Sequence, residues 1–169
     1  MVIASKKQNQ TNNLSMQAKF INPVLTSMVN VLSTMAKLHP TPGKPTIKKD
    51  NQALGAVTGI IAMEGEQAKG SLAVCFPKAV ILDINKRMLH EEKTEIDAMV
   101  EDLTGEIANM VIGGAKKIFE DEGYSFGLTL PRVVSGPDHT IDHPVVGPKI
   151  LLPFTSEPGE FFVEICFEE

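Results

Sequence analysis

Two stretches of this sequence match each other when one is shifted by 91 positions along the chain. The shift lays residues 59–76 over residues 150–167. Each stretch holds two apolar runs separated by turn residues, which is the pattern of a β-hairpin. A shift of 79 positions likewise lays a helical pattern around Met28 over a second one around Ile107. A helix-then-hairpin unit used twice explains both matches. Chance similarity between amphipathic elements is the alternative explanation.

The remaining pattern places these units in a mixed helix and sheet fold. A helix pattern starts at Phe20, with Pro23 in its first turn, where a missing N–H costs little. The elements predicted after it are strands at 56–63 and 70–76, helices at 77–90 and 95–120, and strands at 126–135, 149–154 and 161–167. We therefore expect an α/β fold of the α+β kind, with long helices packed on a mostly antiparallel sheet.

The chain length of 169 residues suits one domain with a sizeable core. Residues 1–15 are polar and rich in Asn, Gln, Lys and Thr. Such a composition predicts a disordered N-terminal tail. Residues 16–169 then form the single predicted domain.

The composition also narrows the classes of partner. A formal net charge of -5, an aromatic content of 5% and the lack of Trp argue against nucleic acid or an anionic membrane as the main partner. No apolar run reaches the roughly 20 residues of a membrane span, and residues 1–10 lack the apolar centre of a signal peptide. Cys75 and Cys166 lie in apolar strand-like runs, which predicts buried reduced thiols and a cytoplasmic protein.

Three polar side chains share one face of the long predicted helix. At about 100° per residue, Asp102, Glu106 and Asn109 fall within an arc of roughly 60°, centred roughly 110° from the apolar residues of that helix. Acidic residues on such a face are usually only solvated. Asn109 fits that interpretation less well, because a mid-helix Asn competes for backbone hydrogen bonds. We call these three residues the polar ridge.

Glycines near the polar ridge favour a role in docking. Gly105 and Gly113 interrupt the helix close to the same face, and each costs about 0.5–1 kcal/mol relative to Ala. A glycine beside polar side chains lets the backbone of another molecule approach closely. Gly114 points nearer the core, which predicts tight packing on the sheet, and Gly123 is the expected stop of the helix.

The chemistry of the ridge suits hydrolysis of a phosphoryl group. A carboxamide both donates to and accepts from a water molecule, so it can orient an attacking water. A nearby carboxylate can pair with a lysine of the partner and fix its pose. Phosphoryl transfer depends mainly on positioning and charge stabilisation. Such side chains would therefore be sufficient if the partner's own site already held a metal and a cation.

The other polar groups of the sequence are weaker candidates for a functional site. The loop before residue 144 contains Asp138, His139, Asp142 and His143. This cluster lacks a convincing further ligand at metal-site spacing, so a surface loop ordered by dimerisation is the preferred interpretation. The pair Lys48-Lys49 is interpreted as a solvated surface pair. The sequence has neither a Ser-centred nucleophile elbow nor a Walker loop.

The chain resembles the CheC/CheX/FliY family of chemotaxis phosphatases over about residues 20–167. The segments that carry the resemblance are 20–23, 31–35, 59–61, 69–72, 105–115 and 130–136, together with His139. The family's site motif is Asp or Ser, three residues, Glu, two residues and Asn, and Asp102, Glu106 and Asn109 meet it. The shift of 79 positions lays Ser27 over Glu106, so the first helix lacks the Glu that a second polar ridge would need. A single ridge per chain resembles the CheX type.

The resemblance implies a CheC-like fold and a phosphatase for the phospho-aspartate of a CheY-type response regulator, which ends the chemotaxis signal. It implies that Asn109 orients the attacking water and that Glu106 pairs with the regulator's lysine, with Asp102, Gly105 and Gly113 in support. It further implies a homodimer without a cofactor of its own, the Mg²⁺ belonging to the receiver domain. A non-catalytic module that binds receivers or flagellar-switch components is the second hypothesis.

Overall fold

The computed structural model describes the backbone of residues 2–66 and 68–168 and the side chains of residues 19–66 and 68–168. Over these residues the chain forms three helices, α1 (Val2–Ala36), α2 (Lys78–Leu89) and α3 (Ala98–Asp121). The strands are β1 (Thr41–Pro42), β2 (Thr46–Lys48), β3 (Val57–Glu64), β4 (Lys69–Phe76), β5 (Gly127–Leu128), β6 (Arg132–Ser135), β7 (Lys149–Ser156) and β8 (Gly159–Phe167). The expected mixture of helices and strands is confirmed; β1 and β2 were not predicted.

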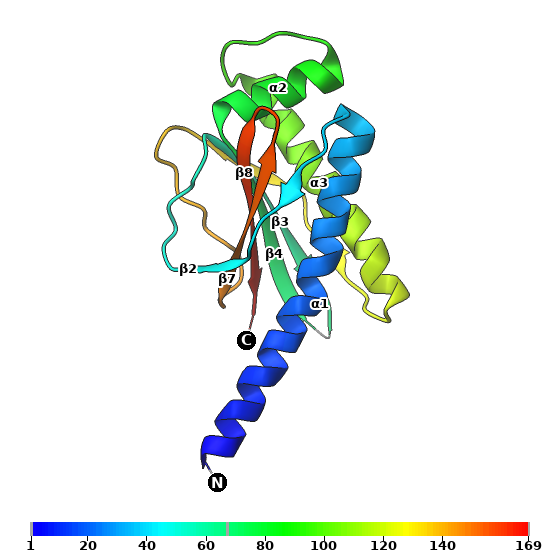
Figure 1. Cartoon of the computed structure of the whole chain (residues 1–169), viewed down its shortest axis with the longest axis vertical. Helices are drawn as coiled ribbons and strands as arrows, with labels where there is room; N and C mark the ends of the chain where they lie inside the picture. The colour runs from blue at the N-terminus through cyan, green and yellow to red at the C-terminus, as the bar shows by residue number, and fades with distance from the viewer. Residues whose placement is uncertain (1, 67, 169) are drawn as a thin grey trace.

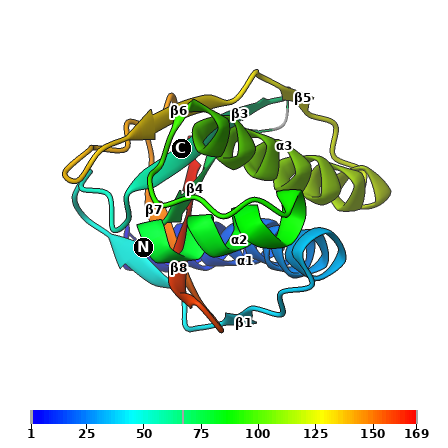
Figure 2. The same ribbon diagram turned by 90° about the horizontal axis from the view of Figure 1, so that it is seen from above.

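The strands form one antiparallel sheet in the order β1-β7-β8-β4-β3-β5, with β2 also paired to β7 and β6 to β3. In Figure 1, α1 and α3 lie to the right of the sheet, and the loops after β2 and after β6 lie to its left. Figure 2, from above, shows the three helices running beside one another. The sheet is therefore covered by helices on one face and by loops on the other.

The strand register supports the repeated hairpin. The pair Ile61↔Leu72 in the first hairpin becomes, after a shift of 91 positions, the pair Leu152↔Val163 in the second hairpin. The inner strands β4 and β8 lie antiparallel at the centre of the sheet. This arrangement is what a pseudo-twofold relation between two hairpins requires, so the shared register extends the sequence match into three dimensions.

A large apolar core lies between the helices and the sheet. Val24, Leu32, Ile107 and Val111 on the helices are fully buried against strand residues such as Leu72. On β3, Gly59 permits close seating of α3, because a Cβ built there would lie 3.0 Å from Thr104 O and 3.1 Å from Ala108 Cβ. The position of α3 relative to the sheet is thus fixed by backbone contact as well as by side-chain packing.

Both ends of α3 carry defined caps. The Asp97 side chain accepts a 3.0 Å hydrogen bond from Val100 N, so the helix begins at Ala98 rather than at the predicted residue 95. At the other end, Gly123 has a φ of +94°, and Tyr124 N donates to Phe119 O at 2.9 Å, as in a Schellman motif. The predicted stop at Gly123 is confirmed, and α3 is a continuous helix of 24 residues.

Helix α1 starts earlier than the composition predicted. It runs from Val2, through the segment 1–15 that was expected to be a disordered tail, and in Figure 1 its first turns project past the sheet. Lys, Gln and Ala are good helix formers, and a helix held by packing further along adds each turn at low cost. Pro23 consequently lies in the helix interior and not in its first turn.

Candidate functional site

The polar ridge lies on the outer face of α3. Asp102, Glu106 and Asn109 are all exposed, whereas the intervening Leu103 and Ile107 are buried in the core. The ridge spans about 10 Å along the helix axis, because each residue adds about 1.5 Å. The buried face of α3 thus holds all three polar side chains on one rigid element, in the arrangement that the sequence predicted.

None of the three ridge side chains has a partner among the residues that the structure describes. Within the part of the chain that the structure describes, Asp102, Glu106 and Asn109 make no hydrogen bond or ion pair. The neighbouring Glu101 differs, since it is half-buried and accepts a 3.3 Å hydrogen bond from Ser135 on β6. The ridge groups are therefore free to hydrogen-bond or ion-pair with another molecule without first breaking a contact in the chain.

The glycines of α3 have different surroundings. Gly105 is buried, and a Cβ there would lie 3.1 Å from Val133 Cγ2, so this glycine serves internal packing on β6 and not docking as predicted. At Gly114 a Cβ would come within 2.3 Å of Ser27 Oγ. The expected tight contact at Gly114 is real, but it is made with α1 and not with the sheet. Gly113 is exposed, with open space where a Cβ would be.

The equivalent face of α1 does not form a second ridge. Ser27 is buried, and its hydroxyl donates a 2.5 Å hydrogen bond to Val111 O of α3. Pro23, one turn earlier, is buried as well. Asn30 is exposed, but without an acidic neighbour at position 27 it stands alone. The described part of the chain therefore carries one polar ridge.

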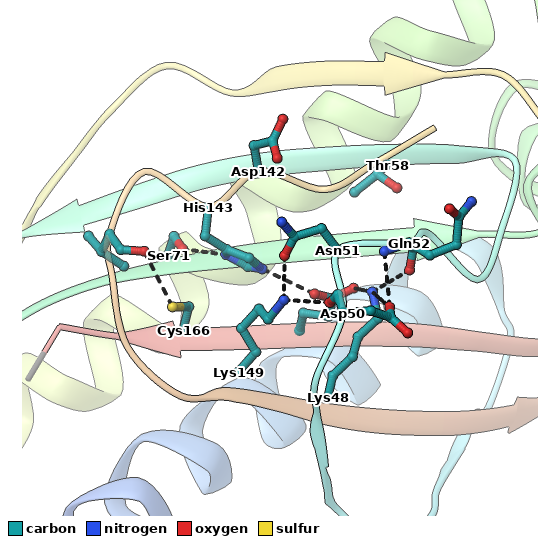
Figure 3. A network of polar contacts seen from close by, with 12 residues as sticks. Lys48, Asp50, Asn51, Gln52, Thr58, Ser71, Asp142, His143, Lys149 and Cys166 are labelled. Carbon is teal, nitrogen blue, oxygen red and sulfur yellow. Dashed lines mark hydrogen bonds and ion pairs between the residues drawn. The ribbon is translucent and has the colours of Figure 1, made fainter. Parts of the chain in front are cut away.

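The polar cluster of the loop after β6 is structural. His143, whose side chain is 3% exposed, contacts Ser71 Oγ through Nδ1 at 2.5 Å (Figure 3). Its Nε2 lies 3.2 Å from Glu164 Oε1. His139 is also buried, with Nε2 2.7 Å from Thr58 Oγ1. The prediction of a surface loop is wrong for both histidines. Within the described residues no group of three potential metal ligands occurs.

The prediction of a solvated Lys48 is also wrong. Its Nζ lies 2.8 Å from Glu164 Oε2, and the two side chains are 6% and 1% exposed. Burial raises the pKa of Glu164, but hydrogen bonds from His143 and Lys48 outweigh it and hold that pKa below its ordinary value. Lys49, the next residue, is exposed as predicted. Glu164 on β8 thus ties the end of β2 and the loop after β6 to the centre of the sheet.

Both cysteines are free and buried, which confirms the prediction of reduced thiols. Burial raises the pKa of the Cys75 and Cys166 thiols above the ordinary value. A buried thiol that stays protonated is a poor nucleophile. Neither cysteine competes with the polar ridge as a reactive centre.

Comparisons with known proteins agree with this geometry. The family model described as Chemotaxis phosphatase CheX matches residues 57–155, which include the polar ridge. The chain belongs to the CheX family. A curated CheX-family relative, the CheY-P phosphatase CheX of Thermotoga maritima, is 26% identical over 124 residues, covering 73% of this chain and 79% of the relative.

Solved structures show the same CheX fold. A CheC-like superfamily protein from Shewanella sp. PV-4 is 52% identical, with a TM-score of 0.83 over 89% of this chain and 98% of that chain. The chemotaxis protein CheX from Vibrio vulnificus is 48% identical, with a TM-score of 0.82 over 88% of this chain and 99% of that chain. The CheC-like fold expected from the sequence is therefore confirmed. No helix in the described residues is long and apolar enough to cross a membrane.

Proposed function

We propose that this CheX-family protein hydrolyses the aspartyl phosphate of a CheY-type response regulator and so ends the chemotaxis signal. The observation that carries the proposal is the polar ridge itself. Glu106 and Asn109 are exposed on a rigid helix and uncommitted within the described chain. They lie inside the region matched by the chemotaxis phosphatase family.

Asn109 orients the attacking water. Its carboxamide oxygen accepts a hydrogen bond from the water while the receiver's phosphoryl group lies on the other side of that water. The water oxygen forms the new bond to phosphorus, the bond from phosphorus to the aspartyl oxygen breaks, and the water's proton leaves to solvent or phosphate. The Mg²⁺ that offsets the phosphoryl charge belongs to the receiver, so this chain contributes positioning alone.

Glu106 fixes the pose of the receiver. One helical turn before Asn109, its carboxylate forms an ion pair with the lysine of the receiver's active site. Asp102 orients the same partner one turn further away. Asp102 does not cap the helix, because the N-cap of α3 is Asp97.

The test follows the decay of phosphorylated CheY with and without this protein. Acceleration well beyond the receiver's own decay supports the enzyme. Binding without acceleration would instead favour the non-catalytic module, for which no feature of the described chain specifically argues.

The protein acts in the cytoplasm as a homodimer under this proposal. Two exposed apolar side chains, Leu130 at 90% and Val146 at 86%, lie in the loops next to the sheet and suit a contact between copies. Sedimentation of the purified protein tests the dimer, since a monomer at micromolar concentration contradicts it.

A further inference from the structure

Gly113 is a glycine of α3 that internal packing does not explain. Gly105 and Gly114 each lie where a Cβ would press on another element, Val133 of β6 and Ser27 of α1. Apart from the backbone of α3 itself, a Cβ at Gly113 would meet no atom of the described chain within 4 Å. Gly113 is also eight residues before the end of the helix at Asp121, so it serves no cap. A glycine in a helix interior is unfavourable, and here nothing inside the chain offsets that cost.

The location of Gly113 links it to the ridge. It follows Asn109 by one helical turn, about 6 Å along the axis, and lies within roughly 40° of it around the helix. A receiver that places its phosphoryl group at Asn109 and extends toward the C-terminal end of α3 lies over Gly113. Gly113 is exposed to solvent and has no side chain, so another molecule can approach the helix backbone more closely there than at neighbouring positions.

We infer that Gly113 is the point where the backbone of the bound receiver passes closest to α3, and that the missing side chain sets how far Asn109 reaches into the receiver's site. The inference rests on the proposed phosphatase function. A Cβ would raise the helix surface by about 1.5 Å, the length of one carbon–carbon bond. A displacement of about 1 Å at a reacting centre can lower a rate by about 100-fold.

The experiment uses Gly113→Ala and Gly113→Gln in the full chain. Both residues are better helix formers than glycine, so the thermal midpoint should rise by about 2–4 °C. The rate on phosphorylated CheY should fall by about 100-fold for Gly113→Ala and by at least as much for Gly113→Gln. Affinity for CheY loaded with Mg²⁺ and beryllofluoride should fall at least tenfold for Gly113→Gln. The matched control is Ala79→Gln, which adds the same side chain to an exposed position of α2.

The outcomes separate this inference from the function on which it rests. If the wild-type protein accelerates dephosphorylation and Gly113→Gln binds and acts like it, Gly113 is not a point of close approach and only this inference fails. If the wild-type protein neither binds nor dephosphorylates CheY, the proposed function fails with it. A loss of activity accompanied by a lower thermal midpoint would also overturn the inference, because it would make Gly113 a structural residue.

Discussion

At the scale of single residues, the proposed function assigns two tasks, which one catalytic side chain often combines, to two side chains of the polar ridge. Asn109 is neutral and cannot act as a strong base, so its proposed contribution is to place a water. Glu106 is charged, so its proposed contribution is to hold a cationic partner. Because each task belongs to a different side chain, substitutions should affect turnover and binding separately.

Asn109→Ala should lower the rate of CheY dephosphorylation by about 100-fold or more, since positioning one water is worth about 3 kcal/mol. Affinity for the receiver should change little. Single-turnover decay of phosphorylated CheY measures the rate. The matched control is Asn30→Ala, which removes the exposed Asn at the equivalent position of α1. Full activity of the Asn109→Ala variant would contradict the assignment of the polar ridge as the catalytic site.

Glu106→Gln should weaken binding more than it lowers the maximal rate, because it removes the charge of the ion pair and keeps the shape. We expect a loss of affinity of about 1–2 kcal/mol that shrinks as salt increases. Titration of CheY loaded with Mg²⁺ and beryllofluoride at two ionic strengths measures it. Glu120→Gln removes a carboxylate further along α3 and is the control. If the affinity for CheY depended on salt to the same extent in both variants, the proposed ion pair between Glu106 and the receiver's lysine would be contradicted.

At the scale of elements, the contact between α1 and α3 fixes the direction in which the ridge points. Ser27 donates to Val111 O across this contact, and the space for its side chain exists because residue 114 is glycine. This small polar contact lies among fully buried apolar residues such as Met28 and Ile107. Interiors are close-packed, so even one added methyl group is felt there.

Gly114→Ala should therefore destabilise the protein by about 1–3 kcal/mol, although alanine favours helix in general. The reason is the distance of 2.3 Å between the new Cβ and Ser27 Oγ. Urea unfolding measures the loss. Ser27→Ala removes the obstructing oxygen, so the double variant should recover part of the stability. Gly113→Ala, next to it but in open space, is the control and should stabilise.

Much of the site could be predicted from the sequence because helical periodicity is local. The spacing of Asp102, Glu106 and Asn109 fixes a shared face in any α-helix. The role of Gly105 could not be predicted from spacing, because the side chain that leaves no room for a Cβ there belongs to Val133, which is distant in the sequence. The early start of α1 was missed because composition says little about a helix that continues from a packed segment.

At the scale of the whole molecule, the two faces of the sheet are stabilised differently. Apolar side chains join the helices to one face, whereas the other face combines a small apolar cluster, which includes Ile60 and Ile141, with the buried charge of Glu164. The alternation along β8 predicts that Glu164 faces away from Val163 and Ile165, toward solvent. It is buried because loops distant in sequence cover that face, which strand alternation alone does not reveal.

Glu164 should make the stability of the protein depend on pH. The pKa of Glu164 in the folded state lies below the ordinary value of a Glu. The ionised carboxylate therefore stabilises the folded state fully at a pH above the ordinary pKa. This stabilisation is lost as the pH falls through the pKa of the folded state. Glu164→Gln should cost about 3 kcal/mol at pH 7, because it leaves Lys48 buried without its counter-charge. Urea unfolding from pH 7 to pH 3 should show the difference from wild type shrinking. A difference independent of pH would contradict this account.

The burial of Ser27 determines what a second ridge on α1 would require. The repeat makes Ser27→Glu look like a one-step route to a second ridge beside Asn30. Such a carboxylate would have to displace the contact with Val111 O and Gly114 that holds the two long helices together. Forming a second site would therefore require repacking the helix pair before any gain in turnover. Each chain is expected to serve one receiver at a time.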